Sequence, residues 1–293
     1  MKLNFTKKLA LSTTFLSALI TTGISAHTLW INMSDYTPAY RQNRGAVTHL
    51  YMGWGHHYPV DGFINADDFT DVSLISPSGK KEALTLRKDG YGETKLTLPE
   101  EGMYLTAITR RPSMNTTYRE NGKQIAVKGP KTGHHEIVSS VYSQQFAKSV
   151  FLSGNSSAGN ISRPIGHTLE IIPLTNPFAL ENNRGGRMKV KVLYKGKPLA
   201  FQKLQAMYEG YSKNDESSAY VSTNRDGIAD IRIDHWGAWV IKTRLDTTPS
   251  DELKDKYRKI FCILDILRSL IQYYLTKEQA ICYSTLKRPV QWR

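Results

Sequence analysis

Residues 71–109 read DVSLISPSGKKEALTLRKDGYGETKLTLPEEGMYLTAIT, and they contain four short segments with the composition of β-strands, at 71–76, 81–86, 94–98 and 103–109. The breaks between them are SPSG at 76–79, KDG at 88–90 and PEEG at 99–102, which are rich in the residues that turns require. Short strands that recur about every 8–12 residues between such turns are typical of a β-sandwich or barrel. This stretch therefore predicts an all-β protein.

The same pattern extends in both directions along the chain. Before it we expect strands at 29–33 and 47–54, and after it a short helix or irregular segment at 136–145 and strands at 146–152 and 167–174. The polar segment ENNRGG at 181–186 is the best linker candidate. Five further strands are expected beyond it, at 188–194, 201–208, 219–223, 228–233 and 238–245. The sequence thus predicts two small β-sandwich domains of the immunoglobulin or transthyretin-like Greek-key kind, at 27–181 and 186–260.

The first 26 residues differ from everything that follows. Lys2, Lys7 and Lys8 precede an uncharged apolar stretch at 9–24, which ends in the small residues Ser25 and Ala26. This is the plan of a secretory signal peptide with its cleavage site. The stretch is short and rich in Ser and Thr for a membrane span, and no later segment reaches the roughly 20 apolar residues that a spanning helix needs. We expect a periplasmic protein without stable membrane insertion. Cleavage after Ala26 would make His27 the first residue of the mature chain, and cleavage after Ser25 would make it the second.

The tail at 261–293 has a different character. Residues 261–275, FCILDILRSLIQYYL, are apolar at helical and continuous spacing, and an alternating final strand is not evident. An amphipathic helix is one interpretation; a foreign end, produced by a change of reading frame, is the interpretation that the pattern favours. We therefore expect an atypical tail outside the fold. It also contains both cysteines, Cys262 and Cys282, which would close a loop of about 20 residues if they paired.

The charge of the chain is basic but dispersed. The formal net charge is +13, or +10 without the three lysines of the signal peptide. The Lys and Arg residues lie among acids and form no run of five or six, which is typical of a solvated surface rather than a nucleic-acid site. We expect no nucleic-acid partner.

Histidine is the residue type that points to chemistry. Two adjacent pairs lie in glycine-containing loops, GWGHHYPVDG at 53–62 and GHHE at 133–136, where neighbouring side chains can converge. A neutral imidazole is a common ligand for nickel, cobalt, copper and zinc. A histidine at the mature N-terminus adds an amine of pKa about 8, whose proton a metal displaces. The candidate metal ligands are His27, His56, His57, His134, His135 and Asp61.

Other assignments compete with this one. His49, His167 and His235 lie in or beside predicted strands, where a histidine is more often a packed or surface residue. There is no HExxH, CxxC or GxSxG motif, and residues 27–261 contain no cysteine. We therefore identify no catalytic residue and expect the protein not to be an enzyme.

Four motifs together resemble a known family. They are HTLWI at 27–31, GWGH at 53–56 followed by YPVD at 58–61, LEIIPLTNP at 169–177, and the Asp226-Gly227 hairpin. They resemble the DUF4198 family, whose members are described as periplasmic components of bacterial cobalt or nickel uptake systems, and the resemblance runs from about 27 to 258. It implies delivery of nickel or cobalt to an inner-membrane transporter of the energy-coupling-factor type. It also implies that His27 and His56 are the leading ligands, with His57 as a further one.

Two alternatives stay open at this point. One is a copper protein that uses its terminal histidine as a brace, either as a carrier or as an oxidative enzyme. The other is a structural or adhesive envelope module whose histidines are incidental. Substitution of His27 or His56 would leave metal content unchanged only in the last case.

Overall fold

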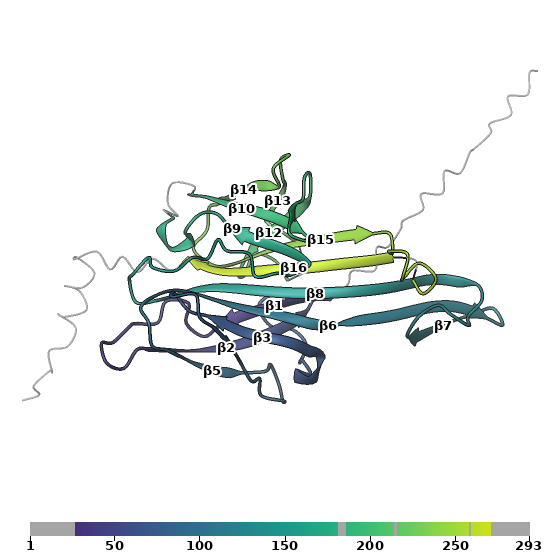
Figure 1. Cartoon of the computed structure of the whole chain (residues 1–293), viewed down its shortest axis with the longest axis horizontal. Coiled ribbons are helices and arrows are strands. Elements are labelled where there is room, and N and C mark those ends of the chain that lie inside the picture. The colour runs from purple at the N-terminus through teal and green to yellow at the C-terminus, as the bar shows by residue number, and fades with distance from the viewer. Residues whose placement is uncertain (1–26, 181–185, 214–215, 258, 271–293) are drawn as a thin grey trace, which may run out of the picture.

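The computed structural model describes residues 27–180, 186–213, 216–257 and 259–270, and within them the chain forms three β-sheets stacked in layers (Figure 1). The outer sheet of the N-terminal half has the order β1-β2-β5, built from β1 (Thr28–Met33), β2 (Ala46–Gly55) and β5 (Thr94–Leu98). The outer sheet of the C-terminal half has the order β11-β10-β14, with β9 paired to β10, from β9 (Leu169–Pro173), β10 (Gly186–Tyr194), β11 (Lys197–Pro198) and β14 (Ile228–Ile233).

The central sheet lies between these two and has nine strands in the described part of the chain. Its order is β13-β12-β15-β16-β8-β6-β3-β4, and β7 pairs with the far end of β6. The strands are β3 (Phe69–Ile75), β4 (Lys81–Ala83), β6 (Gly102–Glu120), β7 (Lys123–Lys128), β8 (Ile137–Ser153), β12 (Lys203–Tyr208), β13 (Ala219–Ser222), β15 (Gly237–Thr247) and β16 (Lys259–Leu270). Two 3-10 turns, η1 (Ala66–Asp68) and η2 (Pro177–Ala179), complete the elements.

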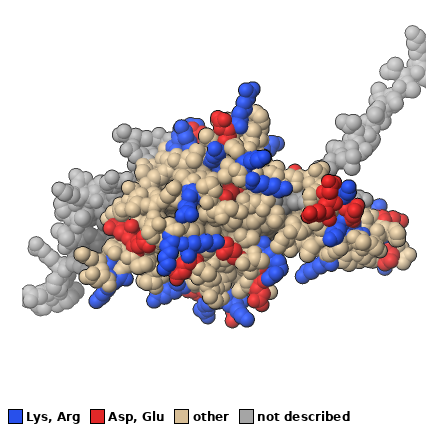
Figure 2. Space-filling model, viewed as in Figure 1, with Lys and Arg blue, Asp and Glu red and all other residues tan. Residues whose placement is uncertain are grey.

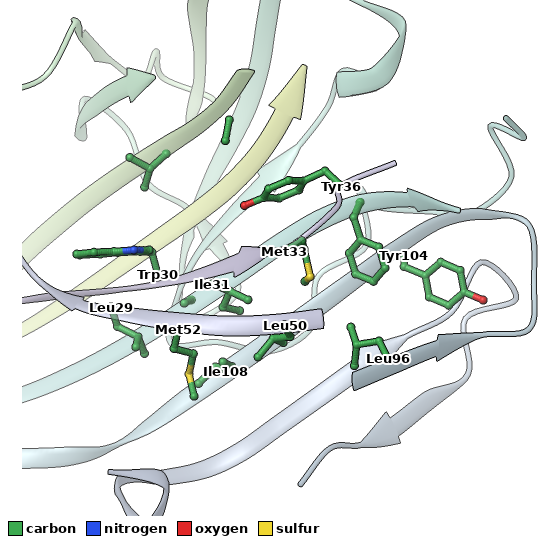
Figure 3. Packing of buried hydrophobic residues seen from close by; sticks show 14 of the residues in the cluster. Leu29, Trp30, Ile31, Met33, Tyr36, Leu50, Met52, Leu96, Tyr104 and Ile108 are labelled. Carbon is green, nitrogen blue, oxygen red and sulfur yellow. The ribbon is translucent and has the colours of Figure 1, made fainter. Parts of the chain in front are cut away.

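Each face of the central sheet carries its own hydrophobic core, because successive residues of a strand point to opposite faces. On β8, Ala147 and Phe151 belong to the core under the β1-β2-β5 sheet, whereas Phe146 and Val150 belong to the core under the β9-β10-β14 sheet. Figure 3 shows the first of these cores, in which Leu29 and Ile31 of β1 and Leu50 of β2 pack together with residues of the central sheet. The prediction of an all-β fold made of β-sandwiches is confirmed, and the two sandwiches share one sheet.

Strand β16 joins the two halves of that sheet. It runs antiparallel to β15 and parallel to β8, with Ile263 opposite Arg244 on one side and Gln145 on the other. Residues 261–270, which we expected to lie outside the fold, thus belong to a strand; residues 271–293 lie outside the described residues. Pairing with a neighbour on each side, rather than local alternation in the sequence, makes this segment a strand.

The expected helix or irregular segment at 136–145 is wrong. Residues 137–153 form one continuous strand, β8, which pairs with β6 over almost its whole length. Pairing with neighbours on both sides outweighs a weak local pattern, since strand preference depends strongly on the surroundings. The expected signal peptide at 1–26 and the linker residues 181–185 lie outside the described residues.

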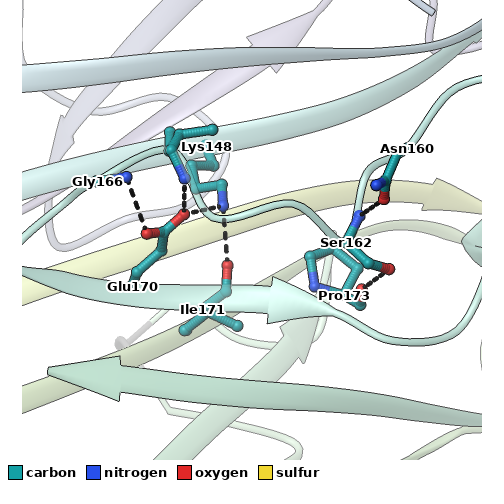
Figure 4. Close-up of polar contacts among 8 residues, drawn as sticks. Lys148, Asn160, Ser162, Gly166, Glu170, Ile171 and Pro173 are labelled. Carbon is teal, nitrogen blue, oxygen red and sulfur yellow. Dashed lines mark hydrogen bonds and ion pairs between the residues drawn. The ribbon is translucent and has the colours of Figure 1, made fainter. Parts of the chain in front are cut away.

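A buried ion pair connects the central sheet to β9 (Figure 4). Lys148 of β8 donates to Glu170 Oε1 at 2.9 Å and to the carbonyl of Ile171 at 3.2 Å, and the Lys148 and Glu170 side chains are 0% and 2% exposed. Glu170 also accepts the backbone N–H groups of Ile165 and Gly166. The carboxylate thus holds the segment before β9 as well as the lysine. Breaking one partner of such a pair would leave a buried charge uncompensated.

The surface carries both signs of charge. Figure 2 shows Lys and Arg interspersed with Asp and Glu over the visible face, without a large area of one sign. Among the residues that the structure describes, no helix is long and apolar enough to cross a membrane.

Candidate metal centre

The pairing of β1 with β2 brings two of the candidate ligands together. Thr28, the first residue of β1, is opposite Gly55, the last residue of β2, in an antiparallel register. The residue before β1 and the residue after β2 are therefore neighbours. The rings of His27 and His56 lie with their centroids 4.6 Å apart and their planes at 75°.

The loop after β2 is organised around Asp61. Its Oδ2 atom accepts the backbone N–H of His56 at 2.7 Å and of His57 at 3.0 Å, and lies 3.1 Å from His57 Nδ1. Gly55 has φ +148°, and a Cβ atom at that position would overlap the Asp61 carboxylate. The glycine therefore lets the chain close around the acid, and both histidines are presented from one tight turn.

Two side chains of β1 hold the same loop against the sheet. Trp30 Nε1 and Asn32 Nδ2 both donate to the carbonyl of Pro59, at 2.7 and 2.9 Å. Tyr58 packs edge-to-face against Trp30 and is buried. The strand that begins at His27 thus also fixes the loop that carries His56.

A second group of residues surrounds His27, from β2 of the outer sheet and from β6 and β8 of the central sheet. Gln145 of β8 donates from Nε2 to the carbonyl of His27 at 2.8 Å, and its Oε1 accepts from Trp54 and Arg110 at 3.4 and 3.3 Å. The Arg110 guanidinium lies over the Trp54 ring and forms an ion pair with Asp68 at 2.8 Å. Trp54 in turn packs edge-to-face on the His27 ring, with centroids 4.3 Å apart.

The electrostatics favour the ligand form of His27. Its pKa is lowered by burial first, then by His56 and by the Arg110 guanidinium, while Asp61 opposes the shift. The pKa of Asp61 is lowered, chiefly by the N–H of His56 and then by the groups of His57, against the effect of burial. At neutral pH the His27 imidazole is therefore neutral, which is the state that binds metals, and the Asp61 carboxylate is charged.

The sequence matches the family described as "Domain of unknown function (DUF4198)" over residues 24–247. It belongs to this family. The match confirms the resemblance drawn from the sequence motifs, and it contains His27, His56, Asp61 and Gln145. It ends before β16.

Other comparisons add little to this assignment. No curated protein matches the chain. Among solved structures, a chain titled "D0-D1 domain of Intimin" is similar at 10% identity, with 82% of this chain and 96% of that chain covered and a TM-score of 0.21. A likeness at that TM-score supports no conclusion about function.

The structure places the second histidine pair of this DUF4198 protein elsewhere. His134 and His135 lie in the loop between β7 and β8, where the His134 ring stacks on Tyr118 at 4.2 Å. In the β6–β8 ladder Tyr118 is eight residues beyond Arg110, which lies at the His27 end. Since a strand rises about 3.3 Å per residue, the two histidine pairs are roughly 25 Å apart.

The remaining histidines are packed in other surroundings. The His167 ring stacks on Phe146 and is 7% exposed, and His235 stacks on Tyr208 at 3.8 Å. His49 lines an open surface pocket of about 500 Å³ on the outer face of β2. These three histidines were not among the predicted ligands, and the structure places them apart from the His27–His56 pair.

The ligand chemistry of the DUF4198 site follows from this geometry. No cluster of three or more His, Cys, Asp or Glu side chains suited to a metal ion occurs in the described residues. A third nitrogen at His27 and His56 would therefore come from the backbone, as the amine that cleavage after Ala26 would release. When His57 donates its Nδ1 proton to Asp61, its Nε2 is the nitrogen left to bind metal, as in many carboxylate–histidine–metal arrangements.

Arg110 and Gln145 were not predicted from the sequence to be parts of the site, and Trp54 was recognised only as part of the GWGH motif at 53–56. Gln145, which bonds the His27 carbonyl, lies 118 positions further along the chain. The sequence around Arg110 and Gln145 does not indicate these contacts, because they depend on how the sheets stack.

Proposed function

We propose that this DUF4198 protein binds nickel or cobalt in the periplasm and delivers the ion to an inner-membrane uptake transporter of the energy-coupling-factor type. The observation that carries the proposal is the contact between the His27 and His56 rings at the point where the mature chain would begin. Metal–imidazole nitrogen bonds are about 2.0–2.1 Å long, so two imidazoles that share one ion have centroids roughly 4.5–6.5 Å apart. The 4.6 Å separation falls in this range.

The setting of the pair supports delivery rather than permanent storage. His27 is exposed, and the His57 side chain is 57% exposed, so an ion bound here is accessible from solvent. Two imidazoles and an amine on a loop leave open coordination positions, in contrast with the closed tetrahedral sites that hold structural metals. An incomplete, accessible site is suited to rapid exchange with a partner.

The test begins with the exported protein. N-terminal sequencing should find His27 as the first residue, and isothermal titration should then detect one Ni²⁺ or Co²⁺ per chain. His27→Ala and His56→Ala should each weaken binding by about 100-fold or more, because even changes of outer-shell partners cost about 10–100-fold. His235→Ala, in the other sandwich, is the matched control and should bind as the wild type does. Unchanged binding in the His27 and His56 variants would contradict the proposal and favour the structural or adhesive alternative.

The closeness of the His27 and His56 rings at the expected start of the mature chain also fits a second candidate, a copper protein with a terminal-histidine brace. Affinity alone does not separate the two, because copper binds nitrogen sites more tightly than nickel does. Growth of a deletion strain on limiting nickel or cobalt does separate them. A growth defect that nickel or cobalt relieves supports the uptake function, whereas a defect relieved only by copper supports the brace.

A further inference from the structure

We propose that Gln145 is a positioning residue that fixes the first residue of the mature chain and so holds the terminal amine beside His56. This inference rests on the proposed function and extends it to a residue outside the ligand set. The first residues of a chain are usually mobile unless something ties them down. His27 precedes β1, so the ladder of β1 and β2 begins only at Thr28. The hydrogen bond from Gln145 Nε2 to the His27 carbonyl, 2.8 Å long, holds this first residue in place.

The surroundings determine which way the Gln145 amide faces. Trp54 Nε1 and the Arg110 guanidinium are donors only, and both lie beside the same end of the Gln145 side chain. That end must therefore be the oxygen, and the NH₂ group faces the His27 carbonyl. Gln145 is 5% exposed, so water does not compete readily for these bonds.

The two donors are themselves held in place. Arg110 is fixed by its ion pair with Asp68 and by its position over the Trp54 ring, 4.8 Å from the centroid. Trp54 contacts the His27 ring from β2. The network therefore reaches His27 twice, through the carbonyl by way of Gln145 and through the imidazole by way of Trp54.

These two contacts determine the place of the nitrogen. The Cα atom of His27 carries the carbonyl carbon, the side chain and the amine nitrogen in a fixed tetrahedral arrangement. Once the carbonyl and the ring are both held, the nitrogen on the same Cα atom is held as well. A preorganised third ligand lowers the ordering cost of binding an ion.

The decisive variant is Gln145→Glu. Its carboxylate can still accept from Trp54 and Arg110, but it offers an acceptor instead of a donor to the His27 carbonyl. Gln145→Met removes all three bonds and serves as the second variant. Gln205→Glu makes the same change at an exposed position of β12 in the other sandwich and is the control.

Two measurements report on positioning rather than on folding. The first is the number of protons released when Ni²⁺ binds near pH 7, obtained by titration in buffers of different ionisation enthalpy. An amine of pKa about 8 releases close to one proton when it becomes a ligand. We expect this release in the wild type and in Gln205→Glu, and almost none in Gln145→Glu, with affinity about 10–100-fold weaker.

The second measurement is the NMR order parameter of the Thr28 amide in the metal-free exported protein. We expect about 0.85 in the wild type and below about 0.6 in both Gln145 variants. Unchanged order, or unchanged affinity and proton release, in the Gln145 variants would overturn the inference. If the wild type binds neither nickel nor cobalt, the proposed function fails, and the Thr28 order parameter alone then decides whether Gln145 positions the terminus.

Discussion

At the scale of single residues, Asp61 determines the shape of the loop that carries His56. Its Oδ2 atom accepts hydrogen bonds from two backbone N–H groups and contacts the His57 ring nitrogen. These bonds lower the pKa of Asp61 below the ordinary 3.8. A carboxyl group whose pKa is lower in the folded state stabilises that state above its unfolded pKa. This stabilisation is lost as the pH falls through the lower, folded-state pKa.

We expect Asp61→Ala to lower the free energy of unfolding by about 1–2 kcal/mol at pH 7, as the loss of a charged acceptor for backbone N–H groups does elsewhere. Because the stabilisation belongs to the charged form, the difference from the wild type should shrink as the pH falls through the folded-state pKa, which lies below 3.8. Urea unfolding at pH 7 and at pH 2.5 measures both values. Asp67→Ala, on the exposed surface of η1, is the control and should show little difference at either pH. An equal difference at the two pH values for Asp61→Ala would show that its charge is not responsible.

Only some residues of the candidate site could be predicted from the sequence. The contact between His27 and His56 could be anticipated, because a terminal strand and a glycine-flanked loop are local features with known ligand chemistry. The convergence of His134 with this pair could not be judged. It depends on how far the β6–β8 ladder extends, and β6 runs to Glu120, far beyond the expected end at 109. Gln145 could not be recognised at all, since its role exists only once β1 is packed on β8.

At the scale of elements, the start of β9 depends on a buried histidine. His167 stacks on Phe146 of β8, and its Nδ1 has no hydrogen-bond partner among the residues that the structure describes. Its pKa is lowered to about 3, by burial first and then by Lys148 and Lys81. The unfolded chain takes up a proton at this histidine near its ordinary value of 6.5, whereas the folded chain does not. Folding stability is therefore lost as the pH falls from about 6.5 towards 3.

We expect His167→Phe to remove this pH dependence. Between pH 6 and pH 4 the wild type should lose up to about 1.4 kcal/mol per pH unit relative to the variant, because one pKa unit corresponds to that free energy. The slope of the difference, obtained from urea unfolding at several pH values, is the measured quantity, so a constant offset from repacking does not matter. His235→Phe makes the same change at a side chain that is about half exposed and is the control. A flat difference for His167→Phe as well would mean that the histidine is protonated in the folded protein.

The elements themselves were predicted with uneven success, for physical reasons. The strand at 94–98 coincides with β5, where turn residues delimit a short alternating segment. The start of β8 was missed because its polar residues resemble a loop until the neighbouring strands supply hydrogen bonds. Turn residues in the sequence thus mark the ends of short strands. The ends of long strands such as β8 are instead determined by hydrogen bonds to the neighbouring strands.

At the scale of the whole molecule, β16 decides whether the two sandwiches behave as one unit. It is the link between β15 and β8, and hence between the strands of the two halves in the central sheet. Strands β1 and β9, from the two outer sheets, both contact it. The sequence from 261 onward was expected to lie outside the fold, whereas residues 259–270 form this strand. A test of β16 therefore distinguishes the expectation from the structure.

Ile266→Pro tests the link. Ile266 is paired with Ile241 on one side and Lys148 on the other, and a proline in the middle of a central strand removes a ladder hydrogen bond and distorts the strand. We expect a loss of about 3 kcal/mol or more in the free energy of unfolding and a transition that separates into two steps, because each sandwich retains its own core. Glu82→Pro, in the short exposed edge strand β4, is the matched control, since edge strands tolerate proline. If Ile266→Pro unfolds like the control in a single transition, β16 does not hold the central sheet together, and the tail lies outside the fold as its sequence first indicated.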